Sequence, residues 1–298
     1  MASRADLAIA CHRAIRNGDP KGLFPDPDSE LLRAVLAGLG VASELVSWDD
    51  PAVDWAERPL TIIRSTWDSV DRPEEYLAWA RAFGGHSTLV NPAEVVAWNL
   101  DKTYLLDLAQ AGIAIVATEW VRAGESWTPP PGEYVVKPSI SAGGRETARY
   151  GADHGDEARA HIARLVAAGQ IVMVQPYLPS VVSPGELSHV FVDGRFTHAV
   201  RKGAVLDVGA GVRERPWERM TFLGLSEPTS SEMAVAEATL ACVQERFGQT
   251  LVYARVDLID GSDDEPQVLE VELIDPNLSL HLSTAATTAL AAALAARV

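Results

Sequence analysis

Two apolar strands near the C-terminus carry carboxylates at alternate positions, and this pattern constrains the fold more than any other feature of the chain. The strands span residues 251–259 and 267–274 and are joined by an acidic loop. Side chains two residues apart in a strand face the same way. Glu270 and Glu272 therefore share one face of the second strand. If the strands pair as a hairpin, Asp257 of the first strand joins them on that face.

A cluster of this kind needs a positive partner. Carboxylates that converge on a sheet face repel one another and lose solvation unless a cation neutralises them. Carboxylate oxygens are the ligands that Mg²⁺ takes in proteins, usually together with substrate phosphates. Arg255 shares the face, and Asn277 either adds a ligand or caps the final helix. The pattern predicts a Mg²⁺ site, and the alternative is a solvated outer face with alternating glutamates.

A lysine followed by a loop of small residues predicts phosphate binding. Lys137 stands in an apolar strand, residues 134–138, where a charge is costly without a partner. The loop that follows contains Ser141, Gly143 and Gly144. Small residues let backbone N–H groups approach phosphate oxygens, and the lysine adds a point charge. The chain contains no Walker motif, and the two glycines by themselves are also compatible with a simple hairpin turn.

A second lysine, Lys102, is expected on the first turn of a helix. Asn99 is the expected N-cap of this helix, which spans residues 100–111 and ends before Gly112. Taken alone, Lys102 is better explained as an ordinary surface lysine.

The N-terminal part alternates strand-like and helix-like segments. This order suggests a small parallel sheet covered by helices, in which ligands bind beyond the carboxyl ends of the strands. Polar residues follow the third strand at that rim, where they either recognise a substrate or form an ordinary helix cap: Arg64, Ser65, Thr66 and Asp68. The expected strands are 6–11, 43–47 and 60–64, and the expected helices are 30–39, capped by Asp28 or Ser29, and 74–83.

Two further units are expected after residue 90. The central one has strands 134–138 and 171–175 and a helix over 156–168. In the last one, strands 187–192 and 196–202 flank Asp193-Gly194, a strong signal for a two-residue hairpin turn. A long helix over 230–247 then ends at Gly248. The expected domains are residues 1–90, 91–172 and 173–298.

Composition narrows the possible partners. The formal net charge of −16 argues against a nucleic-acid-binding surface, which needs a basic stripe. Cys11 and Cys242 form no CxxC pattern, so a disulfide framework or zinc site is not expected, and Cys11 is expected in the core. No signal peptide or membrane span is predicted. We expect a cytoplasmic protein that acts on a small-molecule carboxylate, and a homodimer is compatible with the sequence.

The order of these motifs from about residue 91 to residue 283 resembles the ATP-grasp superfamily, in particular the glutathione-synthetase-like branch with its RimK-type ligases. The resemblance implies an α/β fold, with a Rossmann-like N-terminal domain and two α/β subdomains that clasp ATP. It also implies a role for each candidate. Phosphates would be bound by Lys102, Lys137 and the loop with Ser141, Gly143 and Gly144; adenine by the hinge Gln175, Tyr177 and Leu178; ribose by Glu186; two Mg²⁺ ions by Asp257, Glu270 and Glu272; and the acyl phosphate by Arg201, with Arg255 beside it.

Two positions depart from the pattern of the superfamily. Its last metal ligand is usually Asn, and Glu272 stands there in this chain. An Arg is often found two residues after the ribose-side acid, and Ser188 stands there. The first departure makes the site more acidic, and the second removes a contact to substrate or phosphate.

The resemblance also implies an activity, that of an ATP-dependent ligase. Such an enzyme activates a small amino-acid-type carboxylate as an acyl phosphate and forms a C–N bond, releasing ADP and phosphate. The whole chain, including residues 63–68, is similar to a compact branch of stand-alone enzymes, and the leading specific expectation is ring closure of O-ureido-D-serine to D-cycloserine. Intermolecular amino-acid or dipeptide ligation is an alternative, and a non-catalytic ATP-binding regulatory protein is another.

Overall fold

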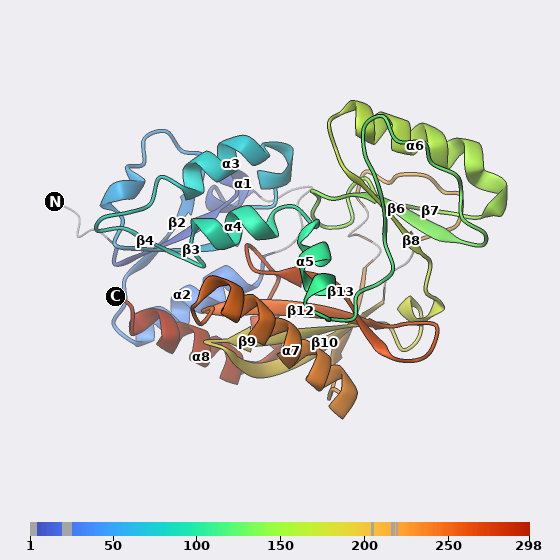
Figure 1. The fold of residues 1–298 in the computed structure, drawn as a ribbon. Coiled ribbons are helices and arrows are strands. Elements are labelled where there is room, and N and C mark those ends of the chain that lie inside the picture. Colours follow the sequence, from blue (N-terminus) through green and yellow to red (C-terminus); the bar gives the residue numbers. More distant parts are fainter. Residues whose placement is uncertain (1–4, 20–25, 204–205, 216–217, 219) are drawn as a thin grey trace.

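The computed structural model describes residues 5–19, 26–203, 206–215, 218 and 220–298. Three sheets organise the described chain (Figure 1). The first is parallel, as predicted, with the strand order β2-β1-β3-β4. Its strands are β1 (Leu7–Cys11), β2 (Ser43–Ser47), β3 (Leu60–Ser65) and β4 (Thr88–Val90).

Helices cover both faces of this sheet, and its central strands β1 and β3 are buried along their whole length. On one side Trp48, Tyr76 and Trp79 pack edge-on in an aromatic core. Cys11 is buried in β1, as predicted. The helical segments of this part are α1 (Arg13–Arg16), α2 (Asp28–Gly38), η1 (Trp55–Glu57), η2 (Ser69–Asp71) and α3 (Pro73–Ala80).

The predicted cap of α2 is wrong. Asp28 and Ser29 lie inside the first turn of the helix, and their backbone N–H groups donate to the Asp26 carboxylate at 3.2 and 3.0 Å. An aspartate two or three residues upstream can therefore satisfy the free N–H groups of a helix start. Asp28 is left to pair with Arg64, and both side chains are 2% exposed.

The segment around Lys102 also differs from its prediction. The single expected helix is two helices, and Asn99 ends the first of them instead of capping the second. The Asn99 side chain instead donates to the carbonyl of Val271 and accepts from the N–H of Leu273, both at 2.8 Å. Lys102 lies in the turn between the helices. The helices are α4 (Ala93–Asn99) and α5 (Tyr104–Gln110).

The second sheet has the order β5-β8-β6-β7 and is antiparallel, with α6 lying along one face (Figure 1). It extends past the domain boundary predicted at residue 172, because β8 belongs to it. The three-domain division stays a prediction. The elements are β5 (Glu119–Val121), β6 (Tyr134–Pro138), β7 (Ala148–Tyr150), η3 (Ala152–His154), α6 (Gly155–Ala167), β8 (Val172–Pro176) and η4 (Pro179–Val181).

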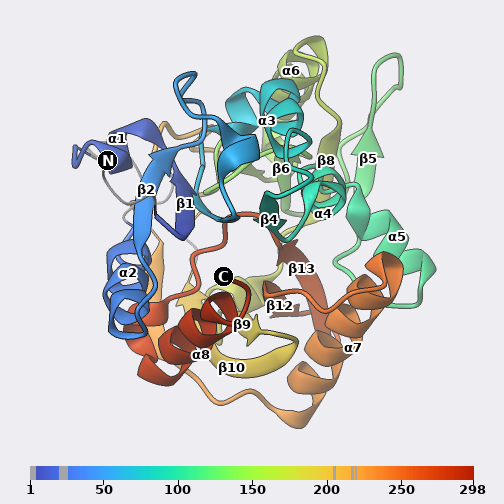
Figure 2. The same cartoon turned by 90° about the vertical axis from the view of Figure 1, so that its left-hand side faces the viewer.

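The third sheet has the order β11-β10-β9-β12-β13, also antiparallel. The turn between β9 and β10 is the predicted one, with Asp193 and Gly194 at φ 49° and 74°. In Figure 2, α8 (red) and α7 (orange) lie to the left and to the right of β9 and β10 of this sheet. The elements are β9 (Glu186–Val192), β10 (Arg195–Gly203), β11 (Thr221–Leu225), α7 (Ser230–Phe247), β12 (Tyr253–Asp260), β13 (Pro266–Glu272), η6 (Leu280–Leu282) and α8 (Thr284–Ala295).

The last two helices have clear local causes. A capping box between Thr229 and Glu232 starts α7, and Gly248 in the left-handed conformation ends it. Ser283 caps α8, so Asn277 is not its cap. No helix among the described residues is long and apolar enough to cross a membrane.

Asn91 links the first sheet to the third, and we expect substitutions at this position to lower the stability of the protein strongly. Its side-chain amide donates to the carbonyls of Tyr253 and Leu273, both at 2.8 Å, and accepts from the N–H of Val252 at 3.2 Å. Its backbone is left-handed, with φ 55°, a conformation that Asn tolerates better than Ala.

We expect Asn91→Ala to lower the free energy of unfolding by about 3 kcal/mol, because it leaves buried backbone groups without partners and strains the backbone. Urea denaturation measures the change. The control is Asn17→Ala at an exposed C-cap, which should change stability by less than about 0.5 kcal/mol. Equal effects of the two variants would contradict the linking role of Asn91.

Candidate active site

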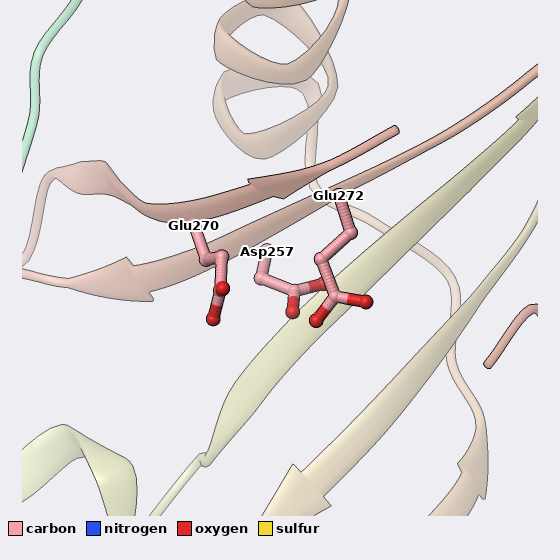
Figure 3. Close-up of side chains that lie close together, drawn as sticks. All are labelled: Asp257, Glu270 and Glu272. Atoms are coloured by element: carbon pink, nitrogen blue, oxygen red, sulfur yellow. The ribbon is translucent and has the colours of Figure 1, made fainter. Parts of the chain in front are cut away.

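The predicted carboxylate cluster forms on the hairpin of β12 and β13. The register pairs Asp257 with Glu270 and Arg255 with Glu272, so all four side chains share one face. Figure 3 shows the three carboxylates projecting together from that face. One ligand oxygen from each of them lies within 4.8 Å of the others. This spacing fits a set of oxygen ligands around a divalent cation.

Three basic side chains surround the carboxylates. Asp257 contacts Arg255 at 2.7 Å and Lys202 at 3.3 Å. Glu270 contacts the ammonium of Lys102 at 3.0 Å, and Glu272 pairs with Arg255. The cluster is therefore neutralised in part by the protein itself, which lowers the cost of gathering like charges in a cleft.

The pKa values of Asp257 and Glu272 are shifted in opposite directions. Burial opposes the ionisation of Asp257, but Arg255 and Lys202 outweigh it and hold the pKa of this carboxyl below its usual range. Desolvation raises the pKa of Glu272 to about 8, because Glu270 and Asp257 add to it and Arg255 offsets only part. A divalent cation at this site would favour the ionised form of Glu272 by removing the repulsion.

Lys137 faces the same cleft from β6. Desolvation lowers the pKa of its ammonium to about 8, and the neighbouring charge of Lys102 adds to this effect. Lys137 and Lys102 both line the cleft together with Glu270. Two lysines that approach each other in a desolvated place suit a polyanion, because each negative oxygen relieves the repulsion between them.

The glycine loop after β6 is tied to Lys102. The Lys102 ammonium donates to the carbonyl of Ser141 at 2.7 Å, and its backbone N–H donates to the carbonyl of Ser139 at 2.9 Å. Gly143 and Gly144 adopt φ values of 60° and 73°, which strain any residue with a Cβ atom. All residues from 141 to 145 line the cleft. The backbone of this loop therefore lies beside Lys102 and Lys137 in the cleft. This is the arrangement that the sequence predicts for phosphate binding.

The cleft has a volume of about 290 Å³, and the N-terminal part closes one side of it. Trp67, Ser69 and Val70 form this wall, next to Asp275 of the segment after β13, whose backbone carbonyl accepts from the Trp67 indole at 3.1 Å. The residues predicted to recognise the substrate are sequence neighbours of these wall residues. Arg64, Ser65 and Thr66 are at most 3% exposed and do not line the cleft. Asp68 is also outside the lining and accepts from Trp48 and Arg72.

Strand parity separates Arg201 from the cleft. Lys202 and Val200 line it, whereas Arg201 points to the other face of β10 and pairs with Glu232 at 3.1 Å. Lys202 is the residue that sequence reasoning missed. It lies opposite Glu186, which it contacts at 2.6 Å, and burial raises the pKa of Glu186.

The sequence predicts that a basic residue of β10 lies opposite Glu186, but it does not predict which one. A regular two-residue hairpin turn pairs Val192 with Arg195, and counting outward pairs Glu186 with Arg201. An irregularity between Phe196 and His198 shifts the register by one residue, so that Lys202 takes this place.

The predicted adenine hinge is not among the residues that line the cleft. Gln175 donates from its side chain to the Thr118 hydroxyl at 2.9 Å, and the Tyr177 ring lies under the guanidinium of Arg149. Leu178 precedes η4. The adenine role of these three residues stays a prediction.

Comparison with known proteins shows the family to which the chain belongs. It is 34% identical over 291 residues to the cycloserine biosynthesis protein DcsG of Streptomyces lavendulae, and the match covers 94% of this chain and 96% of the relative. The chain belongs to the DcsG family of ATP-grasp ligases. The family described as D-cycloserine synthetase DcsG, N-terminal domain, matches residues 8–91.

Two solved structures extend the comparison. The crystal structure of D-cycloserine synthetase DcsG superposes with a TM-score of 0.85 at 32% identity, over 98% of this chain and 99% of that one. A RimK-domain ATP-grasp protein from Sphaerobacter thermophilus superposes with a TM-score of 0.65 at 19% identity, over 98% of both chains, and shares the fold.

Membership of the DcsG family confirms the predicted ATP-grasp fold and the predicted class of enzyme, an ATP-dependent ligase that forms C–N bonds. In this chain the residues matched by the DcsG N-terminal family include Trp67, Ser69 and Val70, which all line the cleft.

Proposed function

We propose that this chain closes O-ureido-D-serine into D-cycloserine at the expense of ATP. The observation that carries the proposal is the extent of the likeness to DcsG, which runs through the N-terminal residues 8–91 as well as the ATP-grasp region. Those N-terminal residues supply one wall of the cleft that the lysines also line. A substrate binds where the wall and the lysines meet, so likeness in both parts supports a shared substrate.

Residue roles in the proposal follow from the geometry of the cleft. Lys102 and Lys137 hold the phosphates of ATP, and the loop from Ser141 to Gly144 covers them. The cluster of Asp257, Glu270 and Glu272 fits Mg²⁺, because three carboxylate oxygens lie within 4.8 Å of one another. Bound Mg²⁺, two ions in this proposal, would offset the negative charge that develops on the phosphates during transfer.

The chemistry in the cleft needs positioning more than it needs a protein nucleophile. A carboxylate oxygen of the substrate attacks the γ-phosphorus of ATP, which gives an acyl phosphate and ADP. The ureido nitrogen that is bonded to oxygen then attacks the acyl carbon, and phosphate leaves. Hydrolysis of the carbamoyl group on this nitrogen, which departs as CO2 and NH3, completes the conversion to D-cycloserine. Arg255 lines the cleft and donates to the carbonyl of Asn277 at 3.1 Å, so its guanidinium is held where a substrate carboxylate arrives. The glycine loop keeps out water that would hydrolyse the intermediate.

Phosphate release tests the proposal. The purified protein with Mg-ATP and O-ureido-D-serine should release phosphate at least about 100-fold faster than with ATP alone, because without a substrate carboxylate only water, which the closed cleft excludes, could accept the phosphoryl group. Mass spectrometry of the product should show the mass of D-cycloserine. Phosphate release without that mass, or with the mass of two joined amino acids, would replace ring closure by intermolecular ligation. ATP binding that no carboxylate converts into phosphate release would overturn the ligase assignment for this chain.

A further inference from the structure

Five carboxylates line the cleft, and four of them have a basic partner. Glu186 and Asp257 contact Lys202, Glu270 contacts Lys102, and Glu272 contacts Arg255. Asp275 is the exception, because within the described chain it forms no ion pair. A carboxylate in a desolvated cleft without a cation is costly. Its presence there is explained most simply by a cation that arrives with the ligand.

Asp275 is held in place by neutral donors. The Thr66 hydroxyl donates to its Oδ2 atom at 3.0 Å, and the Tyr76 hydroxyl lies 2.8 Å from the oxygen of Thr66. Burial raises the pKa of Tyr76 well above its usual value, so the phenol keeps its proton and can donate to Thr66. The indole N–H of Trp67 donates to the backbone carbonyl of Asp275 at 3.1 Å. These contacts fix the carboxylate and leave its remaining lone pairs to the cleft.

The charged groups around Asp275 do not neutralise it. The positive charge of Arg64 acts on Asp275, but Arg64 is paired with Asp28, and Asp68 adds an opposing negative charge. Burial accordingly raises the pKa of the Asp275 carboxyl to about 6. An ammonium group bound against this carboxylate would restore its ordinary ionisation.

The segment that carries Asp275 also touches the arginine of the cleft. Arg255 donates to the carbonyl of Asn277, two residues further along, at 3.1 Å. The Arg255 guanidinium of β12 therefore lies against the short stretch that carries the Asp275 carboxylate, and both residues line the cleft. This arrangement matches an α-amino acid, whose carboxylate and ammonium lie on one carbon atom.

We propose that Asp275 binds the α-ammonium group of the substrate and that Thr66 and Tyr76 position it for this contact. The site thus selects amino acids with a free α-amino group and rejects simple carboxylates and N-acylated amino acids. Asp275 is a specificity-determining residue, and Thr66 is a positioning residue. The inference rests on the proposed function for the nature of the substrate, and it goes beyond it by assigning the recognition of one group to one residue.

The test compares each substrate with its analogue that lacks the α-amino group. For the unmodified protein, kcat/KM should be about 100-fold higher for O-ureido-D-serine than for the deamino analogue, because the analogue leaves Asp275 unpaired. In Asp275→Asn, kcat/KM for O-ureido-D-serine should fall by about 100-fold, while the value for the deamino analogue should change by less than about 3-fold. The preference for the amino compound is then lost.

Two further variants make the result specific. Asp107→Asn alters another partly buried aspartate, whose carboxylate accepts from the Trp98 indole and pairs with Arg246 at 3.2 Å. Asp107 lies outside the cleft, so this variant should keep the full preference. Thr66→Val removes the hydroxyl that holds Asp275 and should reduce the preference by roughly 10-fold. It also provides the measurement if Asp275→Asn does not fold.

The outcomes separate the two proposals. If the unmodified protein makes no D-cycloserine, the proposed function fails, and the preference is then measured with whichever amino acid stimulates phosphate release and with its deamino counterpart. If the Asp275→Asn and Thr66→Val variants both keep the preference for the amino compound, or lose activity equally with both compounds, the role of Asp275 is overturned even though ring closure stands.

Discussion

Glu270→Gln should reduce Mg²⁺-dependent phosphate release by at least about 1000-fold while the protein stays folded. The change keeps the shape of the side chain and removes one of three carboxylate ligands. It also leaves the ammonium of Lys102, which Glu270 contacts at 3.0 Å, without its ion-pair partner. Both effects act in the cleft and not in the core, because the Glu270 side chain is 27% exposed.

Phosphate release at saturating ATP and substrate measures the loss, and thermal unfolding checks the fold. The matched control is Glu245→Gln on the exposed side of α7, which should retain full activity. Restoration of the rate by raising Mg²⁺ would indicate a weakened metal site. Full activity of Glu270→Gln at low Mg²⁺ would remove Glu270 from that site.

Lys137→Met should reduce phosphate release by about 100- to 1000-fold and should raise the thermal stability of the protein without ATP. The pKa of Lys137 in the folded protein is about 8, below the ordinary value of 10.5. Protonation therefore favours the unfolded chain. This penalty is fully present below about pH 8 and declines as the pH rises toward 10.5. Replacement by a neutral side chain removes the penalty at pH 7.

The same shift predicts a pH dependence of ATP binding. As the pH rises through about 8, the lysine in the empty cleft loses its proton, so the affinity for ATP should fall in the unmodified protein. Lys137→Met should bind ATP weakly at every pH, without this dependence. Lys202→Met is not a suitable control because Lys202 lies in the same cleft, whereas Arg58→Met lies far from it and should leave the profile unchanged. A variant Lys137→Met with unchanged ATP affinity would contradict the phosphate role.

Local chemistry was sufficient for much of the fold and for half of the site. The helix α7 could be predicted with its bounds because a capping box starts it and a glycine ends it. The carboxylates on β12 and β13 could be predicted because the period of a strand is two residues and the apolar positions fix which face is buried. A functional position for Lys137 of β6 could be predicted because a charged side chain in an apolar strand is costly unless it has a partner.

Other parts depend on contacts that are distant in sequence. Asn99 resembles a helix cap, but its side chain bonds to the backbone of β13, far along the chain. Arg64 and Thr66 resemble ligand-binding residues because they lie at the end of a strand, yet they are buried and only their neighbours Trp67 and Ser69 line the cleft. Which side of a loop faces a cleft is set by the segment packed against it, and no local pattern encodes that segment.

The sequence by itself determined that a hairpin with three carboxylates on one face exists and that two lysines and a glycine loop precede it, because these features depend on residues close together in the chain. Only the tertiary structure decided their partners. An irregularity in one hairpin brings Lys202 instead of Arg201 to face Asp257, since a shift of one residue exchanges the two faces of a strand. Packing across 209 residues sets Thr66 against Asp275. Neither outcome has a local signal, because both follow from how separate sheets meet.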